Sequence, residues 1–168
     1  MPQVVVALGS NVGNPLRHLQ AATAILRERF ELLATSRVYR TEPMYVVDQP
    51  SFLNAAVLLR TDLGPLPMLQ ELKAIESEIG RRQSNRYGPR EIDLDLISFG
   101  SLKYRYRSDG REVLQVPHPR IPERRFVLAP LYDVAPDYRP PGMPSVRSML
   151  DQTNDQAGSV LEVGDAFL

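Results

Sequence analysis

The spacing of apolar residues changes several times along the chain, and each spacing predicts a different element. A continuous β-branched run over 3–8 predicts a buried strand. Asn14-Pro15 then predicts the start of a helix, because asparagine caps helices and proline fits their first turn. The apolar stripe of this helix recurs at helical spacing and consists of Leu16, Leu19, Thr23, Leu26 and Phe30.

The following segments predict three more strands and a second helix. The strands are expected over 32–39, 52–59 and 91–99, and a loop is expected over 41–51. The second helix is expected over 65–79 and should end at Gly80, a residue that commonly terminates helices. Its inward-facing positions are Leu66, Leu69, Leu72, Ile75 and Ile79.

This order of elements, β-α-β-β-α-β, is typical of the split βαβ, ferredoxin-like arrangement. We therefore expect an α+β protein with an antiparallel sheet and a C-terminal extension made of a hairpin and a helix. The hairpin is expected over 102–116 with its turn at 108–110, and the helix over 122–131. Residues 136–145 are rich in proline, and the tail over 151–168 is expected to be partly disordered.

The last of these strands alternates apolar and acidic residues, in the order Ile92-Asp93-Leu94-Asp95-Leu96. Alternate side chains of a strand point to opposite faces, so the apolar ones should enter the core and both aspartates should share the other face. Two carboxylates at that spacing repel each other unless a cation lies between them, and Mg²⁺ prefers oxygen ligands. A strand with one solvated face is the alternative, although aspartate is depleted in strands.

Arginines precede the acidic pair in a polar segment, at Arg81, Arg82, Arg86 and Arg90. A solvated basic loop is the usual explanation for such a run. Carboxylates that hold a metal beside guanidinium groups that hold anions instead predict a site for a metal and a polyphosphate. The acidic pair directly downstream favours this second interpretation.

Two further clusters carry candidate chemistry. Phe52 and Asn54 fall on one face of their strand, where a ring beside a carboxamide suits a flat heterocycle with a hydrogen-bonding edge. A core phenylalanine and an asparagine near a strand end are the more common explanation of these two residues alone. His118 is followed by Arg120, Arg124, Arg125 and Phe126, whereas His18 lies within a predicted helix and is assigned no role.

Length and composition predict one domain over 1–168, with a core of about 1–135 and an irregular tail of about 136–168. The net charge is zero, so no overall field attracts nucleic acid or a membrane. The absence of cysteine excludes thiolate chemistry and fits a cytoplasmic protein. No apolar run reaches transmembrane length, and the N-terminus predicts a strand rather than a signal peptide. Without a Walker A or Rossmann glycine pattern, nucleotide binding must depend on the aspartates and arginines.

Together and in this order, the clusters resemble the 6-hydroxymethyl-7,8-dihydropterin pyrophosphokinase family of folate biosynthesis. The matching segments are ALGSN at 7–11, YRTEP at 39–43, QPSFLNAAV at 49–57, GR at 80–81, RYGPREIDLDLISFG at 86–100 and VPHPRIPERRFVLAPL at 116–131. The resemblance implies a ferredoxin-like fold. It also implies that ATP donates its β,γ-diphosphate to the hydroxymethyl group of the dihydropterin, which releases AMP.

The resemblance also implies a role for each site residue. Asp93 and Asp95 are expected to ligate two Mg²⁺ ions that bridge the phosphates of ATP. The dihydropterin is expected to contact Thr41, Pro43, Phe52, Asn54 and Phe126. The ATP-binding positions are Arg81, Arg82, Leu96, His118 and Arg124, and the catalytic ones are Arg81, Arg90 and Asp95. The implied partners are these two small molecules, without nucleic acid or membrane, and the implied state is a monomer.

Two other classes of function stay open from the residues alone. A ferredoxin-like binding module is one, but zero net charge and the lack of an aromatic-rich strand motif argue against RNA binding. A small-molecule sensor would not need both aspartates. A different metal-dependent enzyme, such as a nucleotidyltransferase, explains the aspartates but not the pairing of Phe52 with Asn54.

Overall fold

The computed structural model describes residues 1–42, 48, 50–80 and 91–168, and its centre is an antiparallel sheet. The strands of this sheet are β1 (Gln3–Ser10), β2 (Glu31–Thr35), β3 (Tyr39–Thr41), β4 (Phe52–Arg60), β5 (Asp93–Phe99) and β8 (Val160–Glu162). A separate hairpin consists of β6 (Tyr104–Ser108) and β7 (Arg111–Val116). The helices are α1 (Pro15–Arg29), α2 (Pro65–Ile79), α3 (Arg125–Val134) and α4 (Val146–Gln152), with short 3-10 helices η1 (Ile121–Glu123) and η2 (Asn154–Ser159).

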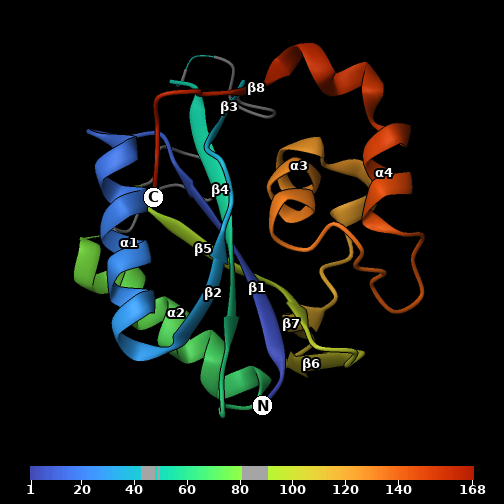
Figure 1. The fold of residues 1–168 in the computed structure, drawn as a ribbon. Coiled ribbons are helices and arrows are strands. Elements are labelled where there is room, and N and C mark those ends of the chain that lie inside the picture. The colour runs from blue at the N-terminus through green and yellow to red at the C-terminus, as the bar shows by residue number, and fades with distance from the viewer. Residues whose placement is uncertain (43–47, 49, 81–90) are drawn as a thin grey trace.

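The strands of the main sheet lie in the order β5-β1-β4-β3-β8, and β2 also pairs with β4. Every pairing in this sheet is antiparallel. Helices α1 and α2 cover one face, and α3 and α4 lie on the other (Figure 1). Among the described residues, no helix is both long and apolar enough to span a lipid bilayer.

The two faces of the sheet carry separate apolar cores because the strand side chains alternate. Val4 and Val6 of β1 pack against α1 and α2, whereas Val5 packs against α3 and α4. An irregularity in the pairing of β1 with β5 leaves Ile97 opposite no residue of β1. This bulge allows Leu96 and Phe99 to be buried in the same core although they are three residues apart in sequence.

Helix α1 begins where its sequence predicts but ends at Arg29, before Phe30 of the predicted apolar stripe, whereas α2 ends as predicted. The Asn14 side chain accepts a hydrogen bond from the Arg17 backbone N–H, and Pro15 occupies the first turn of α1. Helix α2 spans the predicted residues and ends at Gly80, whose φ of 100° is left-handed. A Cβ atom there would lie 2.9 Å from Oε2 at the end of the Glu91 side chain, so this carboxylate would have to shift.

The prediction of one strand over 32–39 is wrong, because the segment divides into β2 and β3. The interruption lies at Ser36, whose hydroxyl accepts the Ala56 backbone N–H at 2.8 Å and donates to the Arg37 carbonyl. A side-chain oxygen thus takes the place of a backbone acceptor in the ladder with β4. The chain pairs with β4 again from Tyr39 onward.

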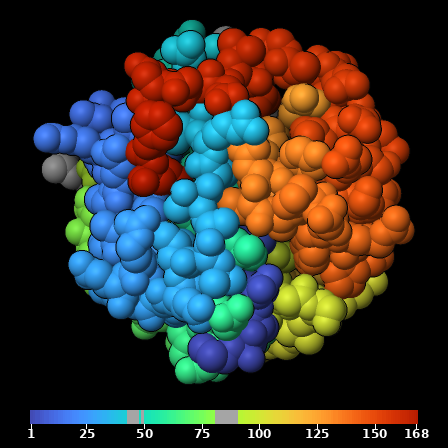
Figure 2. Space-filling model, in the orientation of Figure 1, coloured from blue at the N-terminus to red at the C-terminus, as the bar shows by residue number. Residues whose placement is uncertain are grey.

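The expected partly disordered tail is also wrong, because residues 151–168 form η2, β8 and an ordered C-terminal segment. Strand β8 pairs with β3, and the Val163 N–H donates to the Val38 carbonyl at 2.8 Å. The end of the chain then reaches α1, where Gln20 donates to the Phe167 carbonyl (Figure 2). The tail is polar, but it satisfies the open backbone edge of β3, which the local sequence does not reveal.

The predicted hairpin corresponds to β6 and β7, and Asp109 and Gly110 form its turn with positive φ angles of 52° and 73°. The predicted helix over 122–131 corresponds to η1 followed by α3, which continues to Val134. Residues 136–145 contain neither helix nor strand, as predicted. Helix α3 packs on β4, so the C-terminal part of the chain covers the face of the sheet that carries Phe52 and Asn54.

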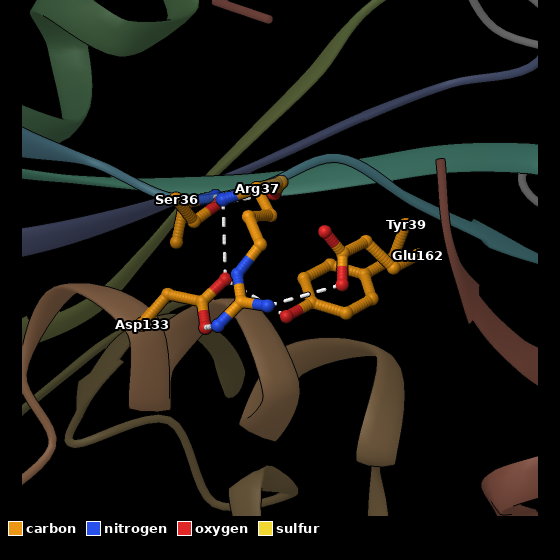
Figure 3. Close-up of polar contacts among 6 residues, drawn as sticks. Ser36, Arg37, Tyr39, Asp133 and Glu162 are labelled. Atoms are coloured by element: carbon orange, nitrogen blue, oxygen red, sulfur yellow. Dashed lines mark hydrogen bonds and ion pairs between the residues drawn. The ribbon is translucent and has the colours of Figure 1, made fainter. Parts of the chain in front are cut away.

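Asp133 fastens α3 to the segment that leads into β3 (Figure 3). Its Oδ2 atom accepts hydrogen bonds from the Tyr39 hydroxyl at 2.8 Å and from the Arg37 backbone N–H at 3.1 Å. The Arg37 guanidinium lies 3.5 Å from Asp133 Oδ1 and donates to Glu162 of β8 at 3.0 Å. Burial, followed by the bond to Asp133, raises the pKa of Tyr39, so its hydroxyl remains a donor at neutral pH.

We expect Asp133→Ala to lower the free energy of unfolding by about 1–3 kcal/mol, because it leaves two donors without their acceptor. The Asp133 side chain is only 9% exposed, so water cannot fully replace it. Urea unfolding measures the change. The exposed Asp137, whose side chain makes no hydrogen bond within the described part of the chain, provides the control Asp137→Ala. Equal losses in the two variants would contradict the fastening role of Asp133.

Candidate active site

Predicted site residues of β5 and β4 lie in one row across the sheet, with Gly9 of β1 between them. Asp93 of β5 pairs with Gly9 of β1, and Gly9 pairs with Asn54 of β4. Since adjacent strands lie about 4.8 Å apart, the backbones of Asp93 and Asn54 are separated by about 10 Å. The acidic pair and the Phe52/Asn54 pair therefore share one face of the sheet, and strand β1 lies between them.

Gly9 has no side chain, so no side-chain atoms of β1 project between Asp93 and Asn54. A Cβ atom at Gly9 would lie 3.1 Å from Asn54 Oδ1, closer than side chains normally approach. The next residue of β1 on the same face is Ala7, which pairs with Asp95 on one side and Ala56 on the other. Small side chains thus leave room above the centre of the sheet, between the carboxylates and the amide.

The acidic pair lies as the alternation predicts. Ile92 and Leu94 are fully buried beneath the sheet, and Asp93 and Asp95 are partly buried on the opposite face. Burial, followed by the negative charge of Asp93, raises the pKa of Asp95 to about 7. A cation bound by both carboxylates would relieve this repulsion, and Mg²⁺ typically uses one or two protein carboxylates together with water and phosphate.

No third side chain joins Asp93 and Asp95 as a possible metal ligand within the described part of the chain. Within residues 1–42, 48, 50–80 and 91–168, no group of three or more acidic, histidine or cysteine side chains is placed to hold a metal. The Leu96 side chain is 3% exposed and lies in the core beneath the sheet. Any contact between Leu96 and a nucleotide must therefore use its backbone.

The amide side of the row is already organised by hydrogen bonds. Asn54 Nδ2 donates to Thr41 Oγ1 at 2.7 Å, and both residues are buried. Phe52 pairs with Thr41 across β3 and β4, so its ring shares their face. The bond to Thr41 fixes the Asn54 amide and leaves its Oδ1 beside Gly9. The predicted face with an aromatic ring, a hydroxyl and an amide is therefore present.

The third part of the site comes from the loop and helix that cover this face. The His118 backbone N–H donates to the Ile97 carbonyl at 2.9 Å, which attaches the loop to β5 just after Asp95. His118 Nδ1 accepts the Arg120 backbone N–H at 3.2 Å, so in the neutral ring the proton is on Nε2. Burial, followed by the charges of Arg124 and Arg120, lowers the pKa of His118 to about 4. His118 is therefore a neutral donor at physiological pH.

Arg124 connects the parts of the site. Its guanidinium lies 5.6 Å from the centre of the Phe126 ring, close enough for a cation–π contact. Its positive charge contributes to the lowered pKa of His118 and, less than that of Lys73, opposes the rise in the pKa of Asp95. The Phe126 ring packs against the apolar core on this face of the sheet. The structure therefore brings Arg124 and Phe126 to the same face as the acidic pair.

Four predicted site residues, Pro43, Arg81, Arg82 and Arg90, lie outside the described residues. Their expected roles stay predictions.

Two contacts were not anticipated from the sequence. Glu76 of α2 is 2% exposed, and its Oε1 atom accepts the Leu94 backbone N–H at 2.8 Å at the outer edge of β5. A signal was available, because Glu76 interrupts the apolar stripe of its helix four residues after Leu72. An acidic residue on an apolar stripe indicates a buried partner.

The second contact involves His18, which was assigned no role. Its Nδ1 atom lies 3.2 Å from Ser10 Oγ, and the Ser10 hydroxyl donates to the Glu91 carbonyl. Because Ser10 uses its single proton for that carbonyl, His18 Nδ1 must carry the proton of the other bond. This chain of bonds joins α1, the end of β1 and the residues that lead into β5.

We expect Asp95→Asn to reduce the pH dependence of stability in metal-free buffer. The folded protein retains the Asp95 proton up to about pH 7, whereas the unfolded chain loses it near pH 4, so the free energy of unfolding falls as pH rises between these values. The asparagine variant lacks this loss and should be more stable than wild type at pH 8. Urea unfolding in the presence of a chelator measures the free energy of unfolding of each protein at pH 5.5 and pH 8. The matched control is Asp137→Asn, and identical slopes in all three proteins would contradict the raised pKa.

Comparisons with known proteins identify the family of the chain. Residues 5–136 match the family model of 7,8-dihydro-6-hydroxymethylpterin-pyrophosphokinase. The chain is 43% identical over 141 residues to the 2-amino-4-hydroxy-6-hydroxymethyldihydropteridine pyrophosphokinase of Pseudomonas aeruginosa, covering 83% of this chain and 84% of that protein. It is 48% identical over 133 residues to the mitochondrial folate synthesis bifunctional protein of Pisum sativum, covering 79% of this chain and 25% of that protein.

Solved structures show the same fold. The chain resembles the wild-type HPPK-DHPS of Plasmodium falciparum with a TM-score of 0.75 and 16% identity, over 92% of this chain and 45% of that one. The chain thus spans about a quarter of the plant bifunctional relative and under half of the parasite structure. The family match covers most of the chain and includes every described site residue. The chain belongs to the 7,8-dihydro-6-hydroxymethylpterin-pyrophosphokinase family.

Proposed function

We propose that this chain transfers the β,γ-diphosphate of ATP to the hydroxymethyl group of 6-hydroxymethyl-7,8-dihydropterin. One observation carries the proposal. The acidic pair and the Thr41/Asn54 pair lie on one face of the sheet, on opposite sides of Gly9. A site for a metal–polyphosphate thus adjoins a site for a flat ring with a hydrogen-bonding edge.

The proposed chemistry requires alignment of two substrates more than covalent help from the protein. The pterin hydroxyl oxygen forms a bond to the β-phosphorus, the bond from that phosphorus to the α,β-bridging oxygen breaks, and AMP leaves. The hydroxyl proton is released in the same step. Positioning and neutralisation of charge are the usual means of catalysing phosphoryl transfer.

The residues of this chain divide that work. Phe52 and Phe126 provide apolar rings for the pterin, and Asn54 and Thr41 provide the groups that read its polar edge. Arg124 and the Nε2–H of His118 provide donors for phosphate oxygens. Asp93 and Asp95 would hold Mg²⁺, which neutralises phosphate charge when it is bound. Arg81, Arg82 and Arg90 complete the proposal on the basis of the family resemblance alone.

The proposal extends to the class of the fold and the location of the protein. The order β5-β1-β4, with β2 and β3 beside β4, supports classing the sheet as ferredoxin-like, with a broken second strand and β8 added at the edge. The absence of cysteine from the sequence supports a cytoplasmic location.

We expect the purified protein to form AMP from ATP only when both Mg²⁺ and the hydroxymethyl-dihydropterin are present. Asp95→Ala should reduce AMP formation to below about one per cent, because a carboxylate is lost where phosphate charge must be balanced. Chromatography of the nucleotides measures the products. The exposed Asp62 gives the control Asp62→Ala, which should retain activity. Release of pyrophosphate with transfer of AMP to the pterin would indicate a nucleotidyltransferase instead.

We expect Phe126→Ala to raise the Kd for the pterin by about tenfold and the Kd for an ATP analogue far less, because an aromatic ring stacks on the pterin and not on phosphate. Isothermal titration of each ligand measures the two constants. Phe167→Ala is the control, since Phe167 is 72% exposed and lies on the C-terminal segment. A similar rise in Kd for both ligands would argue against stacking of Phe126 on the pterin.

A further inference from the structure

Helix α3 begins with a residue that cannot cap it. Arg124 occupies the N-cap position, where serine, threonine, aspartate and asparagine are preferred because their oxygens accept an N–H of the first turn. A guanidinium has donors and no acceptor. Its positive charge is also unfavourable at the positive end of the helix dipole. The position is therefore costly for the helix, although it places a cation at the site.

The missing acceptor is supplied by the C-terminal segment. The backbone N–H of Arg125, the first residue of α3, donates to Gln156 Oε1 at 3.1 Å. Gln156 Nε2 donates to the Glu123 carbonyl at 2.9 Å. One side-chain amide therefore spans Arg124 and binds the backbone on both sides of it, in place of the cap that Arg124 lacks.

The Gln156 amide is itself held in place by its own 3-10 helix. The Gln156 backbone N–H donates to the Thr153 carbonyl at 2.9 Å, and its carbonyl accepts the Ser159 hydroxyl at 3.0 Å. Thr153 is buried, and its hydroxyl donates to the Leu150 carbonyl at 2.9 Å. The amide that contacts α3 therefore projects from a segment with its own hydrogen bonds.

The two consecutive arginines point to different surroundings. The Arg125 guanidinium donates to the Leu150 carbonyl at 2.9 Å and to Asn154 Oδ1 at 3.3 Å, so it is held by the C-terminal segment. Arg124 instead lies over the ring of Phe126, which packs against the apolar core on the site face of the sheet. Contacts to residues 150–156 thus hold Arg125. Arg124 and Phe126 contact each other on the face of the sheet that carries the site. These contacting residues follow the last residue of the family match, 136.

We infer that Gln156 is a positioning residue for the substrate site, which holds the start of α3 so that Arg124 and Phe126 face the pterin and the phosphates. The inference rests on the proposed function of those two residues. It assigns a role in substrate binding to a segment beyond the family match. Because the amide makes one bond on each side of Arg124, its removal releases both backbone neighbours of that residue.

The test compares Gln156→Ala with Gln152→Ala in the complete chain. Gln152 is an exposed glutamine of the same segment, and its side chain makes no hydrogen bond to any described residue. We expect Gln156→Ala to raise the Kd for the dihydropterin by about tenfold, since small displacements of a binding group are costly. We also expect faster hydrogen exchange at the Arg125 N–H, measured by NMR. Gln152→Ala should change neither quantity.

Gln156→Glu provides a partial rescue, because a carboxylate keeps the acceptor for the Arg125 N–H and lies favourably at a helix N-terminus. We expect it to protect that N–H and to keep the Kd within about threefold of wild type. All titrations are made well below the unfolding temperature of each variant. A lower Tm for Gln156→Ala with an unchanged Kd would overturn the inference, because it would indicate a structural brace only. Failure of the wild-type protein to bind the pterin or form AMP would overturn the proposed function, and the positioning role with it.

Discussion

Repulsion between two carboxylates on one strand is the constraint on which the site depends. Asp93 and Asp95 share a face of β5, and the surrounding protein keeps water from Asp95 enough to raise its pKa to about 7. Such an arrangement is unfavourable without a nearby positive charge. Two positive charges oppose the rise in the pKa of Asp95, first that of Lys73 in α2 and then that of Arg124 at the start of α3. The small residues Gly9 and Ala7 of β1 leave room beside the carboxylates for a further cation.

The covering layer distinguishes this site from an open sheet surface. Helix α3 carries Arg124 and Phe126 at its first turn and Asp133 in its last turn. Asp133 bonds to the segment that leads into β3, whose Thr41 holds the Asn54 amide. The first turn receives its cap from Gln156. Both ends of one short helix are therefore bonded to distant parts of the sequence, and Arg124 and Phe126 lie at the end that Gln156 holds.

The C-terminal segment has a larger part in this arrangement than its composition indicates. Its polar residues predicted a partly disordered tail, but β8 completes the edge of β3 and η2 supplies Gln156 to α3. Neither contact follows from local periodicity, because each depends on backbone groups elsewhere that lack a partner. The same reason explains the broken strand over 32–39, where the Ser36 hydroxyl bonds to Ala56.

By itself, the sequence determined which side chains share a face. Alternation placed Asp93 beside Asp95 and Phe52 beside Asn54, and helical spacing predicted α1 and α2, because these periods are properties of the local backbone. Only the tertiary structure decided which faces meet. The row from Asp93 through Gly9 to Asn54, the buried bond from Glu76 to β5 and the cap from Gln156 join residues far apart in the chain. Their register and burial follow from packing of the whole chain, which no local pattern records.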